Sequence, residues 1–235
     1  MTDNTATKPK ANNTFLELIF NIIIPSLILM KLSGDEYLGT VNGLIVALAF
    51  PIGYGLYDFG KTRSLNFFSL LGFLSTLLTG GIGLFELDAK WLAIKEAAIP
   101  AVIGLVVLLS GYSRKPLLAK LILNPVIFNL NLIYDTLAEK NRTAEFKAKM
   151  HRANHLLAST FVFSATANYF LAKFIVTSPA GTVEFNEELG KMTMLSYPVI
   201  AIPSLIMLIG ILVFVVKSIT KLTELKFEDV VNHEE

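Results

Sequence analysis

The chain has 235 residues, of which 53% are hydrophobic and 17% are charged, and its formal net charge is +1. Soluble domains carry about a quarter charged residues, so this composition argues against a soluble globular protein. The near-zero net charge gives no sign of a nucleic-acid partner, and the absence of cysteine excludes disulfides, thiolate nucleophiles and cysteine-based metal sites.

The hydrophobic residues are concentrated in six runs, each long enough to cross a bilayer. About 20 helical residues match the hydrocarbon core of roughly 30 Å, and a helix satisfies its own backbone in lipid. We therefore predict an all-α fold: a polytopic membrane protein with a six-transmembrane-helix bundle and one cytoplasmic interfacial amphipathic helix. The predicted spans are 14–32, 38–57, 66–85, 91–112, 154–176 and 193–216.

The polar residues 1–13 are predicted to form a disordered cytoplasmic N-terminus ahead of the membrane domain, 14–221. The first apolar run is longer than that of a signal peptide and has no convincing cleavage site after it, so we interpret it as a retained helix. Glu17, Asn21 and Pro25 recur in it every fourth residue and share one face. Either Glu17 lies at the interface and Asn21 bonds a neighbouring helix, or both belong to an intramembrane polar site.

Small residues recur every four positions in the second and third runs. This spacing lets a neighbouring helix approach closely, so we predict packing seams, with the wall of a permeation path as the alternative for the second run. The residues are Gly39, Gly43, Ala47, Pro51 and Gly55 in the second run, and Gly72, Thr76 and Gly80 in the third.

Lys95 and Glu96 lie early in the fourth run, ahead of Pro100. If the outer membrane boundary lies near Ala97, both charges are interfacial. If it lies near Trp91, both are inside and must pair, because an isolated charge in hydrocarbon is costly. The sequence leaves both alternatives open, and Pro100 favours a kink because it removes a backbone donor.

Residues 124–153 are too polar to span and place their apolar side chains on one helical face. Later in the same segment, basic residues would favour anionic headgroups: Lys140, Arg142, Lys147, Lys149 and Arg152. We predict an amphipathic helix on the cytoplasmic membrane surface, with a solvated linker as the alternative. The apolar face consists of Val126, Ile127, Leu130, Ile133, Tyr134 and Leu137.

Thr160, Ser164 and Asn168 form a polar stripe in the fifth run. Such side chains commonly bond between membrane helices, at about 0.6 kcal/mol each, and a substrate or ion path is the alternative. His151 and His155 are four residues apart, but Arg152 stands where a zinc protease needs glutamate. We predict no metal, no catalytic residues and no cofactor.

The longest predicted outer loop, 178–191, carries Glu184, Glu187 and Glu188 as candidate partner-docking residues. Two prolines in the sixth run predict a bend or a broken turn there, and 222–235 is the predicted cytoplasmic tail. With both termini cytoplasmic, inner segments and their edges hold 15 of the 20 Lys and Arg residues, which fits the positive-inside rule. The other five are Lys31, Lys90, Lys95, Lys173 and Lys191.

Three motifs carry a resemblance: the run Gly80–Phe85, then Trp91 with Lys95, then the basic-proline run Arg114–Leu118. Together they resemble the intracellular septation protein A family of bacterial inner-membrane proteins, over about 41–215. The chain is similar to an uncharacterised branch, some members of which are loosely labelled transporters. The resemblance implies a role in envelope maintenance or septation and carries over no catalytic residues. Segments 124–153 and 178–191 look longer than in the family.

We expect a non-enzymatic protein with one of two functions. The preferred one is a membrane scaffold for cell-envelope maintenance or septation, whose partners are membrane lipids and envelope or division membrane proteins. The alternative is a small-solute or ion transporter or channel that works as a homo-oligomer. Its candidate intramembrane polar site comprises Glu17, Asn21, Lys95, Glu96, Thr160, Ser164 and Asn168.

Overall fold

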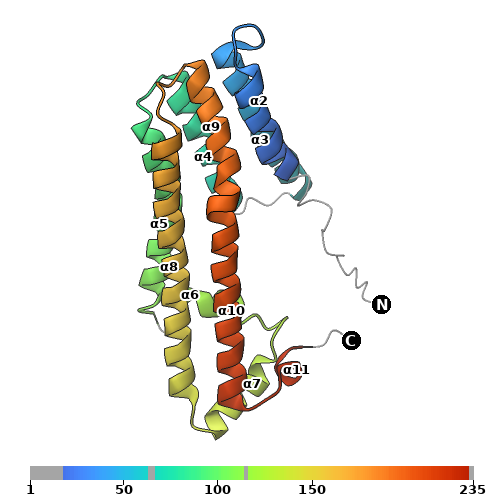
Figure 1. Ribbon diagram of the computed structural model, residues 1–235. Coiled ribbons are helices and arrows are strands. Elements are labelled where there is room, and N and C mark those ends of the chain that lie inside the picture. Colours follow the sequence, from blue (N-terminus) through green and yellow to red (C-terminus); the bar gives the residue numbers. More distant parts are fainter. Residues whose placement is uncertain (1–17, 63–66, 114–115, 233–235) are drawn as a thin grey trace, which may run out of the picture. The chain divides into compact units, whose positions relative to one another are not determined.

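The computed structural model describes residues 18–62, 67–113 and 116–232 (Figure 1). Their regular elements are helices, which confirms the predicted all-α class, and an isolated β-bridge joins Phe128 to Val231. The elements are π-helix η1 Ile19–Ile23, α2 Ile24–Leu32, α3 Gly39–Thr62, α4 Phe67–Leu84, α5 Lys90–Ser110, α6 Leu117–Ile122, α7 Leu130–Glu139, α8 Thr143–Ile175, α9 Val183–Ser196, π-helix η2 Tyr197–Ala201, α10 Ile202–Thr223 and α11 Phe227–Val230.

Three of the described helical segments are long and apolar enough to cross a membrane: Gly39–Tyr57, Lys90–Ser110 and Val183–Thr223. Two apolar helices, Ile19–Leu32 and Leu70–Leu84, are shorter. The structure therefore supports a membrane protein with three candidate spans, whereas the sequence predicts six. The full six-helix bundle stays a prediction.

Helix α8 is longer than the span predicted for this region. It begins at Thr143 rather than Asn154 and runs for 33 residues to Ile175. Its first three turns are rich in alanine, lysine and methionine, which are good helix formers. The preceding turn contains Asn141 at φ 55°, a left-handed conformation that asparagine tolerates after a helix. Three of the basic residues of the predicted cytoplasmic segment, Lys147, Lys149 and Arg152, thus lie in the first turns of α8.

The predicted outer loop 178–191 is mostly helical, which corrects the sequence interpretation. Helix α9 begins at Val183, because the Thr182 hydroxyl accepts a hydrogen bond from the Phe185 N–H at 3.1 Å and caps the helix. The helix then continues through η2 into α10. The π-turn η2 lies at Pro198, where the prolines predict an irregularity.

The chain forms two compact units, each of which has its own core. Unit 1 comprises residues 1–96 and 169–197, and unit 2 comprises residues 97–168 and 198–235.

In unit 1, α2 packs against both α3 and α9, and Figure 1 shows α2 and α3 side by side. The α2–α9 contact is close at Gly190, where an added Cβ would lie 2.8 Å from the Ser26 carbonyl oxygen. Asn186 of α9 is 2% exposed and donates to Ser33 Oγ at 3.1 Å and to Thr40 O at 2.8 Å. These bonds tie α9 to the turn between α2 and α3.

The predicted small-residue seam of α3 is confirmed in part. Gly43 packs against Ser33, and Ala47 is fully buried. Facing this helix, Gly80 of α4 leaves room for Leu48, whose Cδ1 would lie 2.9 Å from an added Cβ. By contrast, a Cβ added at Gly55 would have no neighbour within 4 Å.

In unit 2, part of the apolar stripe of α7 packs against protein. Ile133 and Leu137 are fully buried in a cluster that includes Ile219 and Leu222 of α10. An amphipathic helix was predicted here, and α7 confirms it for Leu130–Glu139. Val126, Ile127 and Tyr134 of the predicted apolar face are exposed, so its contact with the membrane surface stays a prediction. An apolar stripe indicates only that something apolar covers it, and protein and lipid satisfy it equally.

The C-terminal segment folds back onto residues 125–129 of unit 2. The Asn129 N–H donates to Val230 O at 2.9 Å, and the Asn232 N–H donates to Ile127 O at 2.9 Å. The Asn232 amide also donates to Pro125 O at 2.6 Å. The predicted cytoplasmic tail, 222–235, is therefore packed against unit 2 as far as Asn232.

Candidate functional site

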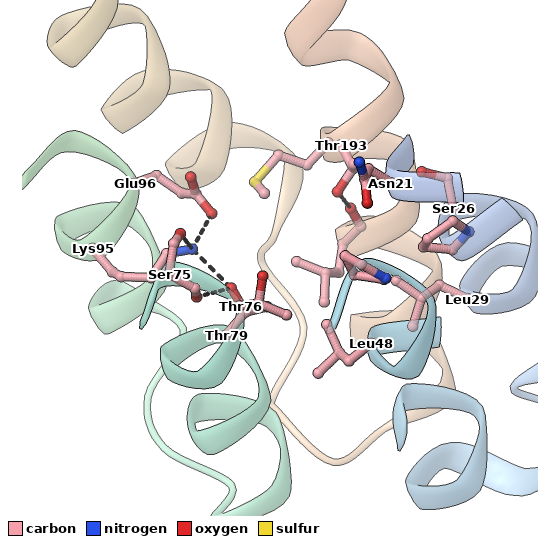
Figure 2. Close-up of a pocket in the computed structure, with 14 residues that line it drawn as sticks. Asn21, Ser26, Leu29, Leu48, Ser75, Thr76, Thr79, Lys95, Glu96 and Thr193 are labelled. Atoms are coloured by element: carbon pink, nitrogen blue, oxygen red, sulfur yellow. Dashed lines mark hydrogen bonds and ion pairs between the residues drawn. The ribbon is translucent and has the colours of Figure 1, made fainter. Parts of the chain in front are cut away.

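A pocket of about 160 Å³ lies in unit 1, among η1, α2, α3, α4, α5 and α9 (Figure 2). We call it the polar pocket because hydroxyl, amide and charged side chains make up more than half of its lining. The polar members are Asn21, Ser26, Ser75, Thr76, Thr79, Lys95, Glu96 and Thr193. The apolar members are Pro25, Leu29, Leu48, Pro51, Leu189 and Met192.

Lys95 is the charge around which the pocket is built, and it is only 9% exposed. Its Nζ donates to Thr79 Oγ1 at 2.7 Å and to Ser75 Oγ at 3.2 Å, and it pairs with Glu96 Oε1 at 2.5 Å. An ammonium has three N–H groups, so these three partners use all of its donors. Lys95 is therefore paired and buried in protein, as the second of the two alternatives requires.

The α4 hydroxyls reach Lys95 because Ser75 and Thr79 are four residues apart and share a helical face. Thr79 donates its own proton to Ser75 O at 3.0 Å, which leaves its oxygen lone pairs for the ammonium. Sequence reasoning missed both residues. Their signal was the pair of hydroxyls at helical spacing in an otherwise apolar run.

One hydroxyl in the pocket has no partner. Ser26 Oγ is buried and makes no hydrogen bond among the described residues, although Ser26 is 0% exposed. Thr76 and Thr193 instead donate to their own helices, to Gly72 O at 3.0 Å and to Leu189 O at 2.9 Å. A buried hydroxyl without a partner is destabilising, so Ser26 marks a position where a ligand could bond.

Of the other predicted intramembrane residues, Asn21 lines the polar pocket, whereas Glu17 lies outside the described residues. The stripe on α8 belongs to unit 2 and bonds within its own helix. Asn168 donates to Ser164 O at 2.8 Å, and Thr160 donates to Leu156 O at 3.2 Å. These bonds run along α8 rather than to a neighbouring helix.

Asn154 makes the bonds between helices that were predicted for that stripe. It is 0% exposed, and its amide donates to Val107 O of α5 at 2.7 Å. Its oxygen accepts from the Leu118 N–H of α6 at 3.1 Å and from Ser110 Oγ at 3.3 Å. Sequence patterns do not single out Asn154, because it stands at the edge of a basic stretch.

The candidate docking residues lie on α9 rather than in a loop. Glu188 accepts from the backbone N–H groups of Thr177 and Ser178 at 2.9 and 2.8 Å, so it organises the connection after α8. Glu187 pairs with Lys191 at 3.6 Å. Among the described residues, no group of three or more histidine, aspartate or glutamate side chains could hold a metal ion.

No protein-family model, curated protein or solved structure matches this chain. The resemblance to the septation protein A family therefore stays a prediction, and the function has to be argued from the polar pocket.

Proposed function

We propose that the chain is a multi-pass protein of the bacterial inner membrane that binds a small polar solute in the polar pocket and carries it across the membrane. The observation that carries the proposal is the buried Lys95 ammonium, bonded to Glu96, Ser75 and Thr79 beside a cavity of about 160 Å³. Ionisable side chains inside membrane helices are costly and characteristically mark substrate or ion paths.

A purely structural ion pair explains this arrangement less well. Well-packed apolar residues of similar volume stabilise an interior as well as a buried ion pair does, or better. The pair also lies beside a cavity and an unpartnered Ser26 hydroxyl rather than in a filled core. A cavity with an unsatisfied polar group beside it is typical of a ligand-binding site.

The proposal includes six spans with both termini cytoplasmic, because this orientation puts most lysines and arginines on the inner side. Helix α8 has 33 residues and a length of about 50 Å at 1.5 Å per residue, more than the hydrocarbon thickness. Its basic first turns would then project into the cytoplasm. A homo-oligomer is included as well, because six spans without an internal repeat are few for a self-contained carrier.

The scaffold function, which the sequence favoured, would use the glutamates of 178–191 and the apolar face of 124–153 as docking surfaces, and part of each has a partner within the chain. Glu188 holds Thr177 and Ser178, and Ile133 and Leu137 pack in a cluster with α10, whereas Val126, Ile127 and Tyr134 are exposed. The polar pocket has no role in a scaffold. We therefore place the transporter first.

The test is solute flux through purified protein in proteoliposomes, followed by osmotic shrinkage and re-swelling with a panel of small polar solutes. The K95M/E96Q variant removes the ion pair. The K90M variant is its matched control, because Lys90 lies on the same helix but is 64% exposed in its pair with Asp88. We expect flux for the unaltered protein and K90M, and at least tenfold less for K95M/E96Q. Folded protein without flux, or equal flux in all three, would contradict the proposal.

A further inference from the structure

We propose that the polar pocket selects a small solute without net charge, of about six non-hydrogen atoms, that carries hydroxyl or amide groups. This inference rests on the proposed function and names the class of substrate.

The lining of the polar pocket has no net charge. Lys95 and Glu96 are the ionisable residues among those that line it, and they neutralise each other. Helix α9 contributes Thr193, the first turns contribute Asn21 and Ser26, and α3 contributes apolar side chains. A charged solute would therefore meet no counter-charge, and an uncompensated charge in a desolvated site is strongly unfavourable.

Neither the Lys95 ammonium nor the Glu96 carboxylate is available to a solute. Lys95 already has three acceptors, so an anion would have to displace Glu96, Ser75 or Thr79. A cation that approached Glu96 would meet the Lys95 ammonium on the same carboxylate. Both ionic partners are consequently occupied by each other.

Two neutral polar side chains of the pocket, Ser26 and Asn21, can bond to a solute. Ser26 Oγ is buried without a partner, and it can both donate and accept a hydrogen bond. The Asn21 amide lines the same pocket and supplies a donor and an acceptor. A site whose buried polar groups gain partners only from the correct solute discriminates strongly against analogues that lack them.

The volume sets the size of the solute. A cavity of about 150 Å³ accommodates benzene, which has six non-hydrogen atoms. The polar pocket, at about 160 Å³, suits a solute of the same size. A three-carbon hydroxy amide satisfies both the size and the bonding requirement.

The experiment uses four near-isosteric probes with six non-hydrogen atoms each: lactamide, alanine, lactate and alaninamide, which are uncharged, zwitterionic, anionic and cationic at neutral pH. The chain has no cysteine, so T193C provides a single thiol in the pocket, and S204C provides a control thiol on α10, outside the pocket-lining set. The alkylation rate is measured on purified full-length protein in nanodiscs, after gel filtration has shown that each variant is folded.

We expect lactamide at millimolar concentration to slow alkylation of T193C severalfold while the other three leave it unchanged, and S204C to respond to none. Adding S26A should weaken the protection by lactamide about fivefold, the loss of one neutral hydrogen bond. Equal or better protection by alanine, lactate or alaninamide, or protection by none of the four, would overturn the inference. Binding of lactamide without flux in proteoliposomes would instead overturn the proposed transport while the charge rule stands.

Discussion

Replacing Lys95 by methionine should destabilise the protein strongly, whereas the same change at Lys90 should not. The K95M variant deletes an ammonium whose side chain is 8% exposed, and leaves Glu96 without its counter-ion and Ser75 and Thr79 without their donor. Removing one partner of a buried ion pair typically costs 3–5 kcal/mol. Because the Glu96 side chain is 23% exposed and keeps some water, we expect about 3 kcal/mol.

Two further variants separate the orphaned charge from the lost packing. In K95M/E96Q the carboxylate that K95M leaves uncompensated is gone, so the double variant should recover about 2 kcal/mol relative to K95M. In K90M the lost pair is exposed at both ends, and exposed pairs contribute little to stability. We thus expect a strong loss of unfolding free energy for K95M, partial recovery for K95M/E96Q and little effect for K90M. Because K95M and K90M make the same change on the same helix, the difference between them reflects burial.

The assay is reversible unfolding of purified protein in mixed micelles with increasing dodecyl sulfate, followed by circular dichroism. A K95M variant within 1 kcal/mol of the unaltered protein, or one that becomes less stable when E96Q is added, would contradict this prediction. Either result would mean that water reaches Lys95 freely and that the pair is not buried.

Three further predictions concern packing and the folded tail. Asn154→Leu should cost 2–4 kcal/mol of unfolding free energy, because it leaves the Leu118 N–H without its acceptor and removes one of the two side-chain donors to Val107 O. Asn168→Leu should cost about 1 kcal/mol or less, and the same unfolding titration compares the two variants. Gly190→Ala should destabilise by about 1–3 kcal/mol because its Cβ would crowd α2, while Gly210→Ala, with open space around it, should be neutral or slightly stabilising. A hydrogen bond from Lys140, together with the charges of Lys140 and Arg142, lowers the pKa of Glu224. The stabilisation of the folded state by the Glu224 carboxylate is therefore fully present above the ordinary carboxyl pKa and is lost as the pH falls through the lowered value. Pepsin should therefore release the tail of the unaltered protein only at the acid end of its range and that of Glu224→Gln throughout, and identical cleavage profiles would count against this contact.

The helices themselves were largely predictable from the sequence. The hydrophobic runs predicted α3, α4 and α5, and most of the predicted helix ends lie within a few residues of the observed ones. Such ends are predictable because they depend on local features, namely the length of the apolar run and the prolines or charges that interrupt it. The helix predicted in place of α8 was too short, because Thr143–Ala153 is polar. Polarity alone does not distinguish a helix outside the membrane from a linker. The start of α9 was missed because its acidic residues suggested a loop, although Thr182 is a suitable cap.

The candidate site was predictable only in its charges. Lys95 and Glu96 stand out in an apolar run, and the rule that such charges must pair holds. Ser75 and Thr79 could not be singled out, because a helical hydroxyl can satisfy itself on its own backbone, as Thr76 does. Which hydroxyls face a charge depends on how α4 is rotated about its axis, and that is set by packing against α3 and not by local pattern.

Transport requires that the polar pocket be part of a path across the membrane, and access to that pocket from both sides tests this most directly. T193C is reconstituted in oriented vesicles and treated with a membrane-impermeant thiol reagent from one face and then, in a separate sample, from the other. A carrier exposes its site alternately, so we predict that the single thiol reacts from both faces, and that K95M/E96Q lowers the rate from at least one of them. Reaction from one face only, or from neither, would contradict transport through the pocket and leave Lys95 and Glu96 as a structural pair.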